Sequence, residues 1–128
     1  MSFGVALPHE LTWETRPHVP GEPARHVAAL SERLGSTQVR SNLWRYESGA
    51  RGKRHRHAIQ EETFVVLSGA LTIYIGEPPE RVEVPAGGAV TVPAGVAVQS
   101  ANHGDEELLA YAYGYPPDHG AEVLDPAV

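Results

Sequence analysis

The stretch that decides the fold spans residues 49–69 and reads GARGKRHRHAIQEETFVVLSG. It carries two histidines one residue apart and, five residues after the second, a glutamate. Side chains of an extended segment alternate between two faces, so His55 and His57 share a face while Arg56 points away from it. Glu62 opens the next extended run, which a short connection can fold back beside the histidines. The spacing therefore predicts that these three side chains meet at one point.

Two histidines and one glutamate form a ligand set that suits a divalent transition metal. Imidazole favours Zn, Cu, Fe or Ni, and such a set leaves coordination positions open. We therefore take His55, His57 and Glu62 as candidate ligands of a divalent Fe, Mn, Zn or Ni ion. The alternative is a metal-free polar cluster in which the carboxylate of Glu62 accepts hydrogen bonds from the imidazoles.

The same stretch resembles the first motif of the cupin superfamily. The motif's order is matched, with five, one, four and six residues between successive members, by Gly49, His55, His57, Glu62 and Gly69. The six-residue interval favours Glu62 over its neighbour Glu61 as the motif's glutamate. In metal-binding cupins these two histidines and this glutamate are ligands, so the resemblance implies the same three roles here.

A later segment resembles the second cupin motif. Gly87, five further residues, Pro93-Ala94-Gly95 and Asn102 follow its order, but Val98 stands where the motif has a fourth metal ligand, a histidine. The resemblance covers residues 38–115. It implies a double-stranded β-helix that often dimerises, and it leaves the reaction open, because cupins include enzymes, sugar-binding regulators and storage proteins.

Short extended runs separated by turn residues indicate an all-β protein without reference to any family. The predicted strands are 38–47, 53–58, 62–68, 70–75, 81–84, 89–92, 96–101 and 107–113. Eight strands at this spacing predict a jelly-roll barrel. We assign residues 1–37 to an N-terminal arm with a short helical segment, 38–115 to the barrel, and 116–128 to a tail with little to bury.

The arm holds two possible elements. Four prolines interrupt residues 1–24, and residues 11–16 fit a short strand that lies at a sheet edge or is exchanged with a second copy. Apolar residues recur at helical spacing from Val27 to Leu34, and Gly35 follows as a stop signal. We expect a turn or a short helix there.

The strand at residues 38–47 has one face that could line a ligand pocket. If that face points inward, Asn42, Trp44 and Tyr46 offer stacking and hydrogen-bonding groups. Alternation alone does not decide which face is the inner one. We favour the alternative in which Trp44 and Tyr46 simply pack between the sheets.

Basic residues cluster around the paired histidines. Four of the ten lysines and arginines fall within six positions: Arg51, Lys53, Arg54 and Arg56. Arg51 and Lys53 share the parity of the histidines and could attract a carboxylate or phosphate at a cavity mouth. We favour the alternative of a solvated strand end. The remaining histidines are expected to be exposed: His9, His18, His26, His103 and His119.

Composition limits the classes of partner. The 128 residues suit one domain, and a net charge of -6 argues against a nucleic-acid or anionic-membrane partner. The absence of cysteine excludes disulfides and thiolate metal sites. No pattern of a signal peptide or membrane span is evident, so we expect a cytoplasmic protein.

Three classes of function follow. The first is a metal-dependent enzyme that acts on a small molecule, with an anion as one candidate. The second is a non-catalytic module that binds a small molecule. The third is a dimeric regulatory cupin with a degenerate metal site, and the resemblance makes a homodimer the expected assembly.

Overall fold

The computed structural model describes residues 2–17, 19–118 and 120–128. Within them the elements are η1 (Pro8–Glu10), β1 (Glu14–Pro17), β2 (Ala24–Ala29), α1 (Leu30–Leu34), β3 (Arg40–Tyr46), β4 (His55–Arg56), β5 (Glu61–Ser68), β6 (Ala70–Ile75), β7 (Glu80–Pro85), β8 (Ala89–Val92), β9 (Val98–Ala101), β10 (Leu108–Tyr115) and β11 (Glu122–Val123). Every predicted barrel strand has an observed counterpart. None of the described helices is long and apolar enough to cross a membrane.

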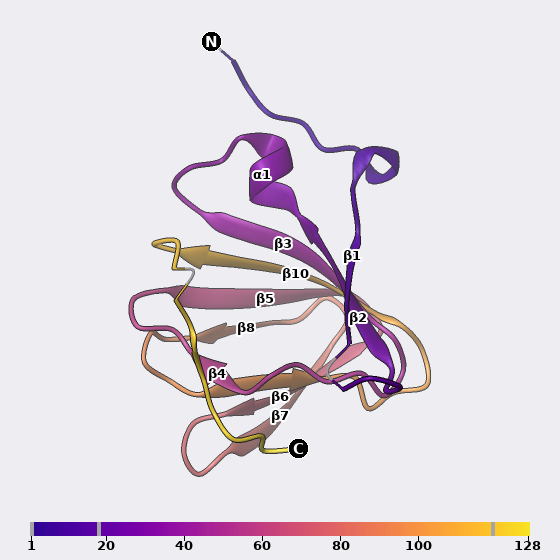
Figure 1. Ribbon diagram of the computed structural model, residues 1–128, viewed down its shortest axis with the longest axis vertical. Helices are drawn as coiled ribbons and strands as arrows, with labels where there is room; N and C mark the ends of the chain where they lie inside the picture. Colours follow the sequence, from indigo (N-terminus) through magenta and orange to yellow (C-terminus); the bar gives the residue numbers. More distant parts are fainter. Residues whose placement is uncertain (1, 18, 119) are drawn as a thin grey trace.

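Two antiparallel sheets face one another (Figure 1). Among the described residues, one sheet has the order β1-β2-β3-β10-β5-β8 and the other β11-β4-β9-β6-β7. Strands adjacent in space are often distant in sequence, as when β10 lies between β3 and β5. This arrangement confirms the all-β, double-stranded β-helix prediction. The boundaries assigned to arm, barrel and tail stay a prediction.

The core lies between the two sheets and follows the alternation read from the sequence. In β5, Phe64 and Val66 are buried whereas Leu67 is half exposed. Leu71 and Ile73 of β6 enter the same core from the other sheet. Inward-facing apolar side chains of both sheets interdigitate, which is the usual source of stability in a two-sheet architecture.

Gly69 turns the chain from β5 into β6. Its φ of 76° lies in the left-handed region that side chains disfavour. A Cβ at this position would lie 2.6 Å from the carbonyl oxygen of Glu107. Both backbone conformation and space therefore require glycine at this position of the first motif.

The arm joins the larger sheet instead of standing apart from it. The β1 strand overlaps the region 11–16 that was expected to be extended, and it pairs with β2 of the same chain. The helix prediction was wrong for Val27, which lies in β2 opposite Trp44 of β3. Pairing with β3 outweighs the weak helical preference of this segment. Only Leu30–Leu34 is helical, and Gly35 ends it with a φ of 71° as predicted.

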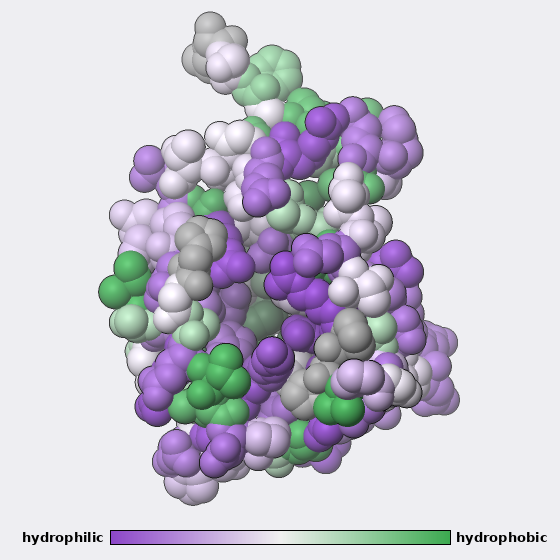
Figure 2. Space-filling view, viewed as in Figure 1, coloured by the Kyte–Doolittle hydropathy of each residue, from purple (hydrophilic) through white to green (hydrophobic). Residues whose placement is uncertain are grey.

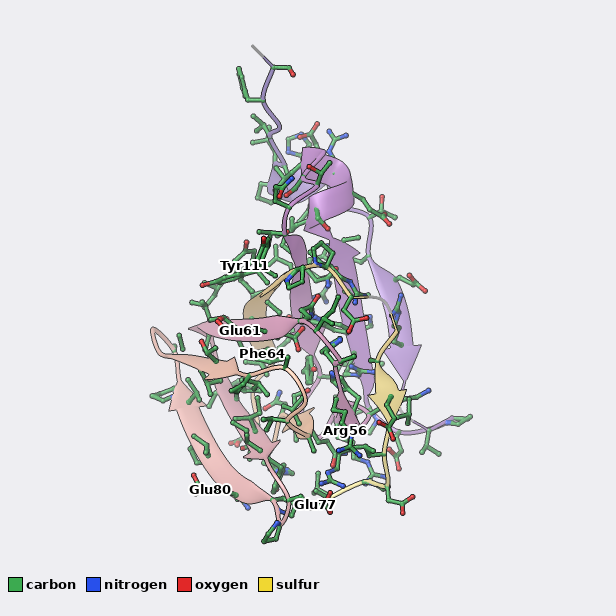
Figure 3. The ribbon with its side chains drawn as sticks, turned by 90° about the vertical axis from the view of Figure 1, so that its left-hand side faces the viewer. Arg56, Glu61, Phe64, Glu77, Glu80 and Tyr111 are labelled. Atoms are coloured by element: carbon green, nitrogen blue, oxygen red, sulfur yellow. The ribbon has the colours of Figure 1, made fainter. Side chains whose placement is uncertain are left out.

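The tail has mostly exposed side chains, as expected, but its backbone is fixed. The β11 strand pairs with β4, with Glu122 opposite Arg56 and Val123 opposite His55. In Figure 3, Arg56 lies beside this short strand. The amide of Leu124 also donates to the carbonyl of Arg54 at 2.8 Å. The tail therefore lies against the strand that carries the histidines.

We predict that Ile73→Ala lowers the free energy of unfolding by about 2–5 kcal/mol, because it leaves a cavity where a fully buried side chain packs. The matched control is Ile59→Ala. Since Ile59 is 57% exposed, its truncation should cost less than about 0.5 kcal/mol. Urea denaturation measures both values, and equal losses would contradict the described core.

Candidate functional site

A cavity of about 210 Å³ opens between the two sheets. Figure 2 shows a hollow on this face of the molecule, with hydrophilic residues around it. Side chains from both sheets line the cavity, among them Arg25, Arg40, Trp44, Tyr46, Lys53, His55, His57, Glu62 and Phe64. The volume is below the roughly 300–1,000 Å³ of drug-sized pockets, so it suits a small molecule.

The two histidines point into this cavity from β4 and the residue after it. Their ring centroids lie 5.0 Å apart and their planes cross at 86°. Nδ1 of His55 lies 2.9 Å from the carbonyl oxygen of Lys53. If Nδ1 carries the proton and donates to this carbonyl, the lone pair of Nε2 is left for another partner. Alternation in a short extended segment thus produces the predicted convergence.

Glu62 of β5 completes the cluster. One ligand atom from each of His55, His57 and Glu62 can be chosen so that all lie within 4.8 Å of one another. Oε1 of Glu62 is 3.8 Å from Nε2 of His57. Oε1 of Glu62 and Nδ1 of His57 are buried and lack a hydrogen-bond partner among the described residues. Glu61, the rival ligand, is exposed. Nδ1 of His57 lies on the side of Asp118, whereas its Nε2 is the atom nearest Glu62. A buried carboxylate oxygen of Glu62 without a hydrogen-bond partner fits a metal ion better than a self-satisfied polar cluster.

Burial also sets the charges of these groups. It lowers the pKa of His55, and the guanidinium groups of Arg25 and Arg40 lower it further. Burial also lowers the pKa of His57, and the neighbouring His55 lowers it further. Burial raises the pKa of Glu62 to about 7, against the opposing effect of Arg40. At neutral pH the imidazoles are therefore neutral, which is the form that binds metal.

Val98 occupies the fourth corner of the site. It pairs directly with His55 between β9 and β4, and it holds the sequence position at which the second motif has a histidine. Its side chain is 2% exposed and belongs to the apolar core. Cross-strand partners point to the same face of a sheet, so a valine without a ligand atom stands beside the cluster. The site therefore offers three protein ligands.

One face of β3 points into the cavity. Asn42, Trp44 and Tyr46 all line the cavity, together with Arg40 at the start of the strand. Tyr46 is buried, and its hydroxyl forms a 2.6 Å hydrogen bond with the Ser100 hydroxyl. The two aromatic rings also contact one another edge to face. The interpretation that these aromatic side chains only pack between the sheets was wrong, because they pack there and also line the cavity.

Asp118 is a residue of the site region that the sequence analysis missed. Its carboxylate accepts hydrogen bonds from the amides of Ala58 and Ile59, at 3.0 and 3.3 Å, and lies 3.9 Å from Nδ1 of His57. Its own amide donates to the side-chain oxygen of buried Gln60. The tail thereby holds the loop that follows the histidines. No pattern in the sequence indicated this contact, because it joins residues about sixty positions apart.

The residues of the basic cluster around the histidines have different roles. Lys53 lines the cavity, as proposed for a cavity mouth. Arg51 does not line it and pairs with Glu22 instead. Arg54 is buried and donates to the carbonyls of Asp125 and Gly76. The favoured interpretation of a solvated strand end was therefore wrong for Arg54, whereas Lys53 is exposed.

The other histidines lie outside the cluster in the described part of the chain. His9 is exposed, and His103 contacts the Tyr74 hydroxyl at the surface. His26 is only partly exposed, because its ring lies between Thr15 and Glu47, 2.9 and 2.8 Å from their oxygens. His18 and His119 lie outside the described residues.

Solved structures share this fold. A sugar phosphate isomerase of the cupin superfamily from Silicibacter pomeroyi is 26% identical, covering 83% of this chain and 73% of that one, with a TM-score of 0.68. A putative sugar phosphate isomerase from Acidithiobacillus ferrooxidans is 21% identical, covering 94% and 91%, with a TM-score of 0.75. A predicted oxalate decarboxylase from Thermotoga maritima is 19% identical, covering 87% and 97%, also with a TM-score of 0.75.

A search of curated proteins gives no match. The family model that describes the cupin domain matches residues 42–113, which is more than half of the chain. Together with the two-sheet fold, the motif spacing and the cluster on β4 and β5, this match shows that the chain belongs to the cupin family.

Proposed function

We propose that this cupin binds a divalent transition metal through His55, His57 and Glu62 and acts on a small molecule held in the same cavity. The observation that carries the proposal is the cluster itself: three ligand atoms lie within 4.8 Å of one another, and the buried Oε1 of Glu62 lacks a hydrogen-bond partner among the described residues. Three protein ligands with an open position are typical of catalytic metal sites. When bound, the metal would supply Lewis-acid polarisation of a substrate oxygen.

The residues around the cluster support an open coordination side. Val98 contributes no ligand atom, and Phe64 with Trp44 gives the cavity apolar walls. An apolar wall limits water and strengthens the electrostatic interactions of a bound ligand. The solved structures named as sugar phosphate isomerases and as a predicted oxalate decarboxylase support a small molecule as the ligand.

A second candidate function is non-catalytic binding of a small molecule at a degenerate metal site. The valine at position 98 favours it, because loss of one ligand weakens metal affinity. Retention of ligand binding by a metal-free His57→Ala variant would select this candidate over the first. The identity of the metal, the homodimer and the cytoplasmic location stay predictions.

We predict that Val98→His raises affinity for Zn²⁺ or Mn²⁺ by about tenfold or more, because it adds a fourth ligand opposite His55. His55→Ala should reduce the affinity by at least a similar factor. Calorimetric titration of chelator-treated protein measures both. Val98→Ala is the matched control for disturbance of the core, and thermal melting verifies that each variant is folded.

Absence of binding in the parent protein after titration with Fe²⁺, Mn²⁺, Zn²⁺ and Ni²⁺ would contradict the proposed metal site. Unchanged affinity in folded Val98→His would contradict only the position given to Val98.

A second prediction concerns pH. In the metal-free protein Glu62 holds its proton up to about pH 7, whereas the unfolded chain releases it near the usual value for glutamate. Between these values the folded state binds more protons, so this group's contribution to stability falls as pH rises. Glu62→Gln should therefore stabilise the metal-free protein by about 1–3 kcal/mol more at pH 8 than at pH 5.

Urea denaturation at both pH values, in the presence of chelator, measures this difference. The matched control is Glu61→Gln, since Glu61 is the exposed neighbour on the same strand. A gain for Glu62→Gln that is no larger at pH 8 would show that the Glu62 carboxyl is not desolvated.

A further inference from the structure

Most lysine and arginine side chains of this chain form ion pairs with carboxylates, but a few do not. Seven of the ten have a carboxylate oxygen within 4.0 Å, in the pairs Arg16–Glu14, Arg33–Glu10, Arg45–Glu107, Arg51–Glu22, Arg54–Glu77, Arg56–Glu122 and Arg81–Glu83. Among the described residues, the three without such a partner are Arg25, Arg40 and Lys53, and all three line the cavity of the metal ligands. In a chain with sixteen acidic residues and a net charge of -6, this concentration needs an explanation.

Arg25 is held in place by aromatic side chains. Its guanidinium carbon lies 4.9 Å from the ring centroid of Trp44 and 5.7 Å from that of Tyr46. Its Nε is buried without a hydrogen-bond partner among the described residues. A planar guanidinium stacked on an aromatic ring is orientated for bidentate contact with a carboxylate or phosphate. Arg25 therefore lines the cavity with a guanidinium group that has no carboxylate partner among the described residues.

Arg40 reaches the cavity from the opposite end of β3. Arg25 lies across from Tyr46 at the end of β3, and Arg40 begins that strand, six residues earlier. Six residues of strand span roughly 20 Å between Cα atoms. Both side chains nevertheless line the same cavity as His55 and His57. The two side chains thus converge on the histidines from opposite directions. One Nη of Arg40 donates to the Asp118 carbonyl at 3.1 Å, which fixes its position.

The charges do not balance within the cavity. Among the described lining residues, Glu62 is the one carboxylate against three unpaired cations, and a divalent metal would add further positive charge. Unpaired cations beside a metal repel it unless an anion joins them. A ligand with two anionic groups satisfies both the metal and the arginines.

We infer that the cavity is specific for a small ligand with two anionic groups, either a dicarboxylate or a phosphorylated acid. Arg40 and the bound metal would hold one anionic group, Arg25 would hold the other, and the exposed Lys53 would attract the ligand at the mouth. The inference deepens the proposed function by naming its ligand class, and it rests on that function for the contribution of the metal. The cavity volume of about 210 Å³ restricts the ligand to a compact molecule.

Calorimetric titration tests the inference with malonate, acetate, neutral malonamide and inorganic phosphate, each on chelator-treated and on Zn²⁺-loaded protein. We expect malonate or phosphate to bind at least about 100-fold more tightly than malonamide, and malonate more tightly than acetate. Inorganic phosphate offers a single anionic group, so its affinity compared with that of acetate shows whether the arginines select phosphate or carboxylate. Arg25→Gln and Arg40→Gln should each weaken malonate or phosphate binding by about 10–100-fold, as expected for the loss of a charge-assisted contact.

Two control variants make the result specific. Arg81→Gln removes an arginine that pairs with Glu83 at the surface, so it should leave the dissociation constants unchanged. Arg25→Lys keeps the charge but loses the planar stacked geometry, and it should give an intermediate affinity. Thermal melting verifies that each variant is folded.

The inference is overturned if malonamide binds as tightly as malonate and phosphate, or if folded Arg25→Gln and Arg40→Gln bind both anions like the parent. Its failure is distinguishable from failure of the metal site. Anion binding that persists in chelator-treated protein unable to bind Zn²⁺ supports the arginine clamp and contradicts the metal site. Zn²⁺ binding without a preference for anionic ligands supports the metal site and contradicts the arginine clamp.

Discussion

The site depends on how one very short strand is anchored. Strand β4 has two residues, yet it carries His55 and directs His57, and its register with β9 rests on a single pair, His55 opposite Val98. Buried Arg54, the residue before β4, donates to the carbonyls of Gly76 and Asp125. Two residues after Asp125, the amide of Ala127 donates to the side-chain oxygen of buried Gln99. Without these bonds a two-residue strand would have too little pairing to fix a ligand geometry.

Electrostatics couples the metal ligands to the cavity's cations. Glu62 is buried enough for its pKa to rise to about 7, and Arg40 is the charge that opposes this rise. A metal ion would favour the ionised carboxylate, and an anionic ligand would offset the unpaired charges of Arg25 and Arg40. Each partner therefore improves the environment of the other. This reciprocity would offset the ligand that is missing where valine stands at position 98.

The parts predicted from sequence are those that depend on local alternation. The spacing of His55, His57 and Glu62 indicated a cluster because one strand and one short connection determine it. The positions of Arg25 in the cavity and of Asp118 beside His57 were not predictable in this way, because they depend on which strands become neighbours. The helical interpretation of Val27 failed for the same reason, since pairing with β3 decides its conformation. The features that were predicted depend on local alternation, whereas the features that were missed depend on pairing between strands distant in the sequence.

Anomalous diffraction from crystals grown with Co²⁺ and malonate tests the central claim most directly. The account predicts one anomalous peak within bonding distance of His55, His57 and Glu62, with malonate between that peak and the guanidinium of Arg25. A cavity without a peak, or a peak bound by other residues while these three remain unliganded, would contradict the account.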